Sequence, residues 1–158
     1  MELGRSAESS FAQTAVKHGW TVEPASKESN INEHFDYSMS KDGKSFRVEV
    51  KSRKRMGRGD MDVQDEYVWV EIHGVRKDDQ GWLYGNADLI AFEMTTSFQL
   101  VRRADLAALI GKLVDFNEMV DVPKDALYKL YSRAGRHDLL TMIRSSDLKK
   151  ITSLEWRK

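Results

Sequence analysis

Two acidic residues and a lysine lie along two short alternating stretches of the chain: Asp36, Glu49 and Lys51. The stretches are joined by Asp42-Gly43, and an Asp-Gly pair between alternating runs is typical of a two-residue hairpin turn. With this turn, Asp36 lies directly opposite Glu49 on one face, with Cβ atoms about 5 Å apart. Opposed carboxylates repel each other, so the arrangement indicates a compensating cation. Lys51 on the same face could supply it, and so could a divalent metal held by carboxylate oxygens.

The apolar residues of the two stretches support this register, because each of them faces an apolar partner. The expected pairs are Phe35 with Val50, Tyr37 with Val48, and Met39 with Phe46. The register also places His34 opposite Lys51. The alternative interpretation is a charged, solvent-exposed side of a hairpin, because the tripeptide acid–x–lysine is common and occurs three times in this chain.

Glu8 is a third acidic candidate, because it precedes an apolar stripe at helical spacing. Residues 6–18 are predicted to form a helix that begins near Ser6 and ends before Gly19. The stripe follows at the spacing of a buried helix face: Phe11, Ala12, Ala15 and Val16. An acidic residue at its head is either favoured by the helix dipole or points inward as a ligand. Beside two carboxylates that need a further ligand, we favour the second interpretation.

The remaining elements are those that would hold this helix and hairpin in place. Residues 21–33 are polar and show no periodicity, which indicates a connection, and residues 53–66 are charged and contain glycines, which indicates a loop. The elements expected further on are a strand pair (67–74 and 82–94), a strand and helix over 97–116 with Asp105 as N-cap, and a strand pair within 126–146 around Ala134-Gly135-Arg136. The aromatic residues of these strands are expected in the core: Trp69, Trp82, Phe92 and Phe98.

The composition limits the class of protein. A chain of 158 residues with 41% hydrophobic and 9% aromatic residues is expected to fold as one globular domain. It has no cysteine, which excludes disulfides, thiol nucleophiles and thiolate-bound zinc, and its four histidines lack the spacing of a zinc site. No apolar run is long enough to span a membrane, and the first residues do not resemble a signal peptide. We therefore expect an intracellular, cytoplasmic protein.

The charge is balanced over the whole chain, with 25 basic and 25 acidic residues, but it is not balanced along it. Residues 44–58 carry seven basic side chains and one acidic side chain, a net charge of +6. Residues 59–123 carry a net charge of −8. A local positive field attracts anionic ligands, although a charge run by itself is more often a solvated loop.

The chain resembles the PD-(D/E)XK nuclease superfamily in the order and spacing of four motifs: Gly4-Arg5-Ser6-Ala7-Glu8, His18-Gly19-Trp20, Asp36 and Glu49-Val50-Lys51-Ser52. Its first half is similar to archaeal-type Holliday junction resolvases, which begin with a glycine, three residues and a glutamate on the first helix. Phe35 stands where the superfamily has a proline, and the chain after about residue 60 departs from the resolvase pattern. The resemblance implies an α/β fold with a restriction-endonuclease-like core, in which a mixed β-sheet is flanked by helices. It also implies Mg²⁺-dependent phosphodiester hydrolysis.

Carried over residue by residue, the resemblance implies a metal site formed by Glu8, Asp36 and Glu49, with Mg²⁺ as the cofactor and Mn²⁺ as a substitute. Lys51 would position or activate the attacking water. Gln64 loosely matches the glutamine–tyrosine motif of RecB-like nucleases, and a polar loop residue is the alternative interpretation. The basic residues that leave the strand after Lys51 would contact DNA phosphates: Arg53, Lys54, Arg55 and Arg58.

The sequence therefore leads to the hypothesis of a Mg²⁺-dependent DNA endonuclease, built as one PD-(D/E)XK-like domain over residues 1–158. Its catalytic core is expected at about 4–110, with a C-terminal strand pair and helix over 124–158 as an elaboration. The substrate could be a DNA structure, as for a Holliday junction resolvase, or a sequence, as for homing or restriction enzymes. Cutting both strands with one site per chain favours a homodimer. The alternative is a non-catalytic nucleic-acid-binding or regulatory module that keeps the nuclease fold.

Overall fold

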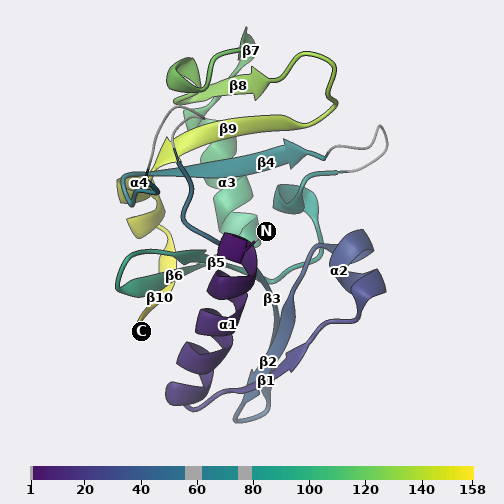
Figure 1. Ribbon diagram of the computed structural model, residues 1–158, viewed down its shortest axis with the longest axis vertical. Coiled ribbons are helices and arrows are strands. Elements are labelled where there is room, and N and C mark those ends of the chain that lie inside the picture. The colour runs from purple at the N-terminus through teal and green to yellow at the C-terminus, as the bar shows by residue number, and fades with distance from the viewer. Residues whose placement is uncertain (1, 56–61, 75–79) are drawn as a thin grey trace.

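Two mixed β-sheets form the framework of this computed structural model, which describes residues 2–55, 62–74 and 80–158. The six-stranded sheet, called the first sheet below, has the strand order β1 (Thr21–Pro24), β2 (Tyr37–Lys41), β3 (Lys44–Lys51), β5 (Leu89–Glu93), β6 (Ser97–Arg102) and β10 (Thr152–Arg157). The four-stranded sheet, called the second sheet, has the order β4 (Tyr67–His73), β9 (Leu139–Arg144), β8 (Lys129–Ser132) and β7 (Asp115–Val120). Figure 1 shows the second sheet above the first, with β4 on the side nearer to the first sheet.

Each sheet contains one parallel strand pair. The parallel pairs are β3 with β5 in the first sheet and β7 with β8 in the second, and the other neighbouring strands are antiparallel. The expectation of a mixed α/β fold is therefore confirmed, with two mixed sheets in place of one. Residues 124–158 are divided between them, because β8 and β9 belong to the second sheet and β10 forms an edge of the first.

Four α-helices and two 3₁₀ turns complete the described part of the chain: α1 (Glu2–Lys17), α2 (Lys27–Glu33), α3 (Arg103–Leu113), α4 (Ser145–Lys149), Trp82–Tyr84 and Pro123–Asp125. Helix α1 lies in front of the first sheet in Figure 1, with its N-terminal end directed towards the second sheet. It docks through Ala7, Phe11 and Ala15, which are fully buried. The buried face therefore differs from the predicted stripe, because Val16 is 60% exposed and Ala7 takes part instead.

The hairpin of β2 and β3 follows the predicted register. Tyr37 pairs with Val48 and Met39 with Phe46. Asp42 and Gly43 occupy the turn with φ values of 52° and 79°, the left-handed conformation that a two-residue hairpin turn requires. The pairs expected before Tyr37 do not form, because β2 begins only at that residue. The preceding helix α2 ends at Glu33, and the C-cap residue His34, with a φ of 56°, turns the chain before it enters the strand.

Three other expectations are corrected by the structure. The polar segment 21–33 contains β1 and α2, and Ser26 caps α2 by accepting a hydrogen bond from the Ser29 N–H. Strands β4 and β5, expected to pair, belong to different sheets, because β4 pairs with β9 and β5 with β3 and β6. The N-cap of α3 is Arg102, and Asp105 lies within its first turn. The strand pair expected within 126–146 is present as antiparallel β8 and β9.

Apolar residues cover both sides of the first sheet. On one side α1 packs against β3, β5, β6 and β10, where Phe11 contacts Phe98 and Trp156. On the other side α3 contributes Leu106 and Ile110 to a cluster shared with residues of β4 and β9, which ties the second sheet to the first. Of the expected aromatic core residues, Trp82, Phe92 and Phe98 are buried and Trp69 is half-buried. Within the described ranges no helix is long and apolar enough to cross a membrane.

Candidate active site

A cavity of about 340 Å³ lies where the end of β3 meets the start of β4. The four residues predicted to be catalytic on the basis of their chemistry all line it: Glu8, Asp36, Glu49 and Lys51. They come from α1, from the residue before β2 and from the end of β3. Arg53, Lys54 and Gln64 line the same cavity. The structure thus brings together side chains that are separated by more than forty positions in the sequence.

Glu49 and Lys51 form an ion pair at the end of β3. They alternate with the buried Val50, so both side chains lie on the same face of the strand. The Lys51 Nζ is 2.7 Å from the Glu49 Oε1, and it lies 5.0 Å from the centre of the Trp82 ring. Burial raises the pKa of Glu49, which is only 7% exposed, while the Lys51 ammonium acts in the opposite direction. The ammonium is therefore held in place by a buried carboxylate and an aromatic face.

Asp36 is oriented by two hydrogen bonds. Its Oδ2 accepts from the Val50 N–H at 2.7 Å, and its Oδ1 accepts from the Asn30 Nδ2 at 2.7 Å. Asn30 also donates to the Phe35 carbonyl oxygen at 3.2 Å, so it links α2 to the residue that precedes Asp36. Sequence reasoning missed Asn30, because α2 lies in a polar segment with no periodicity. The one local signal was Ser26, a residue type that favours helix N-caps.

Glu8 completes the cluster by forming a hydrogen bond with the Asp36 carboxylate. Burial, this hydrogen bond and the negative charges of Asp36 and Glu49 raise the pKa of Glu8 to about 7, against a smaller opposing effect of Lys51. A hydrogen bond between two carboxyl groups requires a proton on one of them. The site therefore gathers three carboxyl groups around one ammonium group.

The carboxyl groups of Glu8, Asp36 and Glu49 are suitable ligands for a hard divalent cation. In this structure they form hydrogen bonds and an ion pair with neighbouring protein groups. Carboxylate oxygens are the ligands that Mg²⁺ takes, and Glu8, Asp36 and Glu49 supply oxygen only. Burial and the neighbouring carboxyl groups raise the pKa of Glu8, and a bound cation would oppose this effect. Among the residues that the structure describes, no three histidine or acidic side chains meet as a ready-formed metal-binding group. The Glu49 Oε1 is occupied by Lys51, and both Asp36 oxygens accept hydrogen bonds.

The basic residues after β3 have different surroundings. The Arg53 Nε donates to the Asp65 Oδ1 at 2.6 Å, and the Asp65 Oδ2 accepts from the Thr95 N–H, so Arg53 belongs to an internal network. Lys54 and Arg55 are exposed. The pKa of Lys54 is lowered by partial desolvation and by the neighbouring Lys51 charge. Arg58 lies outside the described residues, so the expectation for it stays a prediction.

Gln64 lines the cavity with its amide group bonded to the main chain. Its Oε1 accepts from the Tyr67 N–H at 2.7 Å, and its Nε2 donates to the carbonyl oxygens of Lys54 and Tyr67 at 2.8 and 3.0 Å. Gln64 therefore holds the start of β4 against the segment that follows β3. In this arrangement it positions the cavity wall, and the catalytic role that the resemblance implies for Gln64 stays a prediction.

The wall formed by β4 contributes aromatic residues that the motif search did not include. Tyr67 and Trp69 are half-buried and line the cavity. The Arg144 guanidinium lies 5.4 Å from the centre of the Tyr67 ring. No local pattern places β4 beside the end of β3, because the two strands belong to different sheets.

None of the family models, curated proteins and solved structures that were compared with this chain matches it. Functional inference therefore depends on the chemistry of the cavity.

The hydrogen bond from Asn30 to Asp36 leads to a prediction that separates activity from stability. We expect Asn30→Ala to lower the cleavage rate by about tenfold, because residues that orient ligating carboxylates have effects of that size. Asn30 is exposed, so the melting temperature is expected to change by less than about 3 °C. The matched control is Asn32→Ala, which removes an exposed asparagine from the same helix. Equal cleavage rates for the two variants would exclude this role for Asn30.

Proposed function

We propose that this chain is a Mg²⁺-dependent DNA endonuclease of the PD-(D/E)XK type with a restriction-endonuclease-like core. One observation carries the proposal: Glu8, Asp36, Glu49 and Lys51 line one cavity and interact with one another directly. Placing three carboxyl groups, of which Glu49 is buried, around a single lysine is costly for a fold, so the arrangement favours a functional role over a structural one. The match in residue type and order to the superfamily supports the same activity.

The proposed roles follow from the contacts of each side chain. Glu8, Asp36 and Glu49 would hold the Mg²⁺ ion, which when bound polarises a phosphate oxygen and lowers the pKa of a bound water. The Lys51 ammonium would donate a hydrogen bond to the attacking water or to a phosphate oxygen on which charge develops. Trp82 and Glu49 restrict the ammonium to this position. Asn30 and the Val50 N–H keep the Asp36 carboxylate aimed at the cavity.

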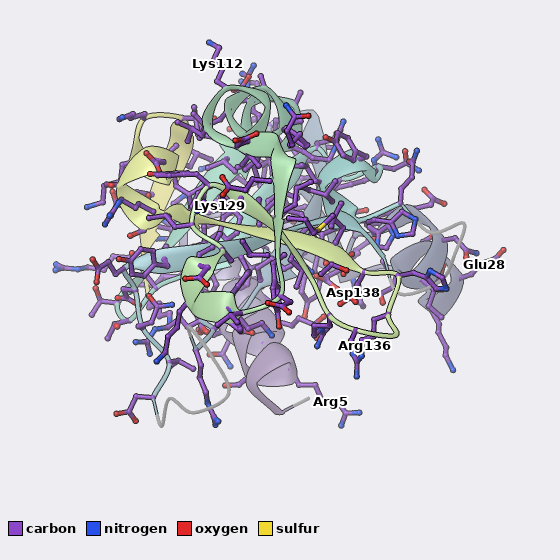
Figure 2. The ribbon with its side chains drawn as sticks, turned by 90° about the horizontal axis from the view of Figure 1, so that it is seen from above. Arg5, Glu28, Lys112, Lys129, Arg136 and Asp138 are labelled. Atoms are coloured by element: carbon purple, nitrogen blue, oxygen red, sulfur yellow. The ribbon has the colours of Figure 1, made fainter. Side chains whose placement is uncertain are left out.

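The proposed DNA contacts are phosphate contacts by exposed basic residues beside the cavity. Lys54 and Arg55 lie three and four positions after Lys51 and are exposed, so they are the best placed of the described basic residues of this segment. Figure 2 shows Arg5 projecting outward from the start of α1, the helix whose Gly4 lines the cavity. One site per chain cuts one strand at a time, so a double-strand break would require two copies, and we propose a homodimer for that outcome.

The salt dependence of DNA binding tests these contacts. We expect Lys54→Glu together with Arg55→Glu to weaken binding and to reduce the slope of log K against log salt by about 2, because each phosphate contact contributes about 0.9. The control is Lys112→Glu, since Figure 2 places Lys112 on the opposite side of the molecule from Arg5. Arg53 is left unchanged, because its replacement would also break the ion pair with Asp65. An unchanged slope in the double variant would place the binding surface elsewhere.

The activity is tested by incubating the protein with supercoiled plasmid, linear duplex and a four-way junction. Each substrate is combined with Mg²⁺, Mn²⁺ or EDTA, and Asp36→Asn is purified in parallel to detect contaminating nucleases. We expect cleavage with Mg²⁺ or Mn²⁺, none with EDTA, and none with Asp36→Asn. If no substrate is cut but DNA is bound, the non-catalytic binding module replaces the nuclease proposal.

A further inference from the structure

The catalytic groups are placed inside the cavity rather than on an open surface. Glu49 is 7% exposed, and the Lys51 side chain is 26% exposed. A phosphate must therefore enter the cavity to reach them. The cavity volume of about 340 Å³ falls in the range of pockets that enclose a small ligand. This volume is much smaller than the space that a double helix requires.

The far wall of the cavity is braced, so it cannot simply swing away from the catalytic strand. The Gln64 amide bridges Lys54 and Tyr67, and the Trp69 Nε1 donates to the Arg55 carbonyl oxygen at 3.1 Å. The Arg53–Asp65 ion pair adds a third connection. All three join the segment after β3 to the start of β4 or to the residues just before it. A substrate strand must fit the cavity as it stands.

The braced wall presents two aromatic side chains. Tyr67 and Trp69 are two positions apart on β4, so they lie on the same side of the strand, and both line the cavity. The Trp69 ring is supported by Tyr131, with 5.5 Å between the ring centres. Tyr67 is supported by the Arg144 guanidinium, which is exposed. Partly exposed aromatic rings that line a cavity are surfaces on which nucleic-acid bases stack.

We infer that the cavity takes an unpaired nucleotide, with its base against Trp69 and Tyr67 and its phosphate at the Lys51 ammonium. The inference rests on the proposed nuclease function and defines its substrate class as unpaired DNA strands: single strands, flaps or bubbles. A paired nucleotide would first have to leave the base stack, which costs a few kcal/mol and costs least where the base is already unpaired. The preference for unpaired over paired nucleotides therefore comes from the shape of the site. It does not require contacts that recognise a particular base sequence.

Binding in EDTA tests the inference without requiring cleavage. A fluorescein-labelled single-stranded 20-mer and the duplex of the same sequence are titrated with the full chain, and fluorescence anisotropy is recorded. We expect tighter binding of the single strand, and a loss of about 5- to 150-fold in its affinity for Trp69→Leu, the range for one stacked base. Leucine keeps an apolar group against Tyr131, and a melting curve verifies that the variant is folded.

Trp20→Leu is the matched control. Trp20 is also half-buried and packs against Phe46 and Trp156 at the far end of α1, and it does not line the cavity. We expect this variant to bind the single strand as the unchanged protein does. If Trp69 and Trp20 variants lose equal affinity, or if the duplex binds as tightly as the single strand, the inference is overturned. If Trp69→Leu does not fold, Tyr67→Leu on the same wall is measured against the same control and decides the question.

Cleavage of the same substrates with Mg²⁺ separates this inference from the proposed function. We expect the single strand, and a duplex with an unpaired bubble, to be cut at least tenfold faster than the fully paired duplex. Cutting of all three at equal rates would overturn the substrate class and leave the nuclease intact. If nothing is cut while Trp69 is still required for single-strand binding in EDTA, the nuclease proposal fails and the cavity remains a site for an unpaired nucleotide.

Discussion

Lys51→Met is expected to cut DNA about a thousandfold more slowly than the unchanged protein when the DNA is fully bound. The ammonium is in direct contact with a carboxylate of the cavity cluster, at 2.7 Å from the Glu49 Oε1. Removing a donor that stabilises developing charge costs two to three orders of magnitude in rate. Methionine keeps the apolar stem against the Trp82 ring, so the packing of the site is preserved. Single-turnover cleavage with saturating protein measures the loss.

The control for this variant also removes the charge of Glu49, the buried partner of Lys51. Glu49 is 7% exposed, so removing its counterion also destabilises the fold. The double variant Lys51→Met with Glu49→Gln removes both charges and should recover most of the lost melting temperature without recovering cleavage. If Lys51→Met cuts at the rate of the unchanged protein, Lys51 has no part in the chemistry and the mechanism proposed above is wrong.

Glu8→Gln is expected to stabilise the metal-free protein at pH 8 and to abolish cleavage. The pKa of Glu8 is raised to about 7 from an ordinary value of 4.5, so the folded state binds this proton more tightly than the unfolded state. The free energy of unfolding therefore falls as the pH rises from about 4.5 to 7, and it stays low above that range. Glutamine carries no charge and can still donate a hydrogen bond to Asp36.

The size of this effect is limited by solvent, because Glu8 is only half-buried. With screening taken into account, we expect a gain of about 1–2 kcal/mol at pH 8, or roughly 2–8 °C in melting temperature for a chain of this length. Melting curves in EDTA at pH 5 and pH 8 provide the measurement, and the gain should be much smaller at pH 5. A gain of the same size at both pH values would show that the charge of Glu8 is not its cause. Adding Mg²⁺ at pH 8 should stabilise the unchanged protein more than Glu8→Gln.

Local patterns in the sequence were sufficient to predict the parts of the fold that depend on neighbouring residues. The β2–β3 register follows from Asp42-Gly43 and from alternation, and the structure pairs Tyr37 with Val48 as expected. The strand and helix after residue 97 and the β8–β9 pair were predicted for the same reason. The placement of Glu8, Asp36, Glu49 and Lys51 around one cavity was predicted from chemistry, since like charges on one face need a common cation.

The remainder of the site depends on contacts between distant parts of the chain. Strand β3 pairs in parallel with β5, and β4 pairs with β9 more than sixty residues further on, so neither pairing leaves a trace in local sequence. Tyr67 and Trp69 could therefore be predicted as strand residues but not as a cavity wall. Asn30 was missed because α2 buries no residue, and a helix without a buried face has no periodic pattern.

The packing of α1 against β10 determines when Glu8 can be delivered to the site during synthesis of the chain. The rings of Phe11 and His18 both stack on Trp156, and the Lys17 Nζ donates to the Lys158 carbonyl oxygen. Helix α1 is made before β10, so it finds these partners only after about 140 further residues have left the ribosome. A growing chain can form the β2–β3 hairpin early, with Asp36, Glu49 and Lys51 in place, before the helix that carries Glu8 has its complete packing surface. The fold thus couples the final placement of Glu8 to the synthesis of β10.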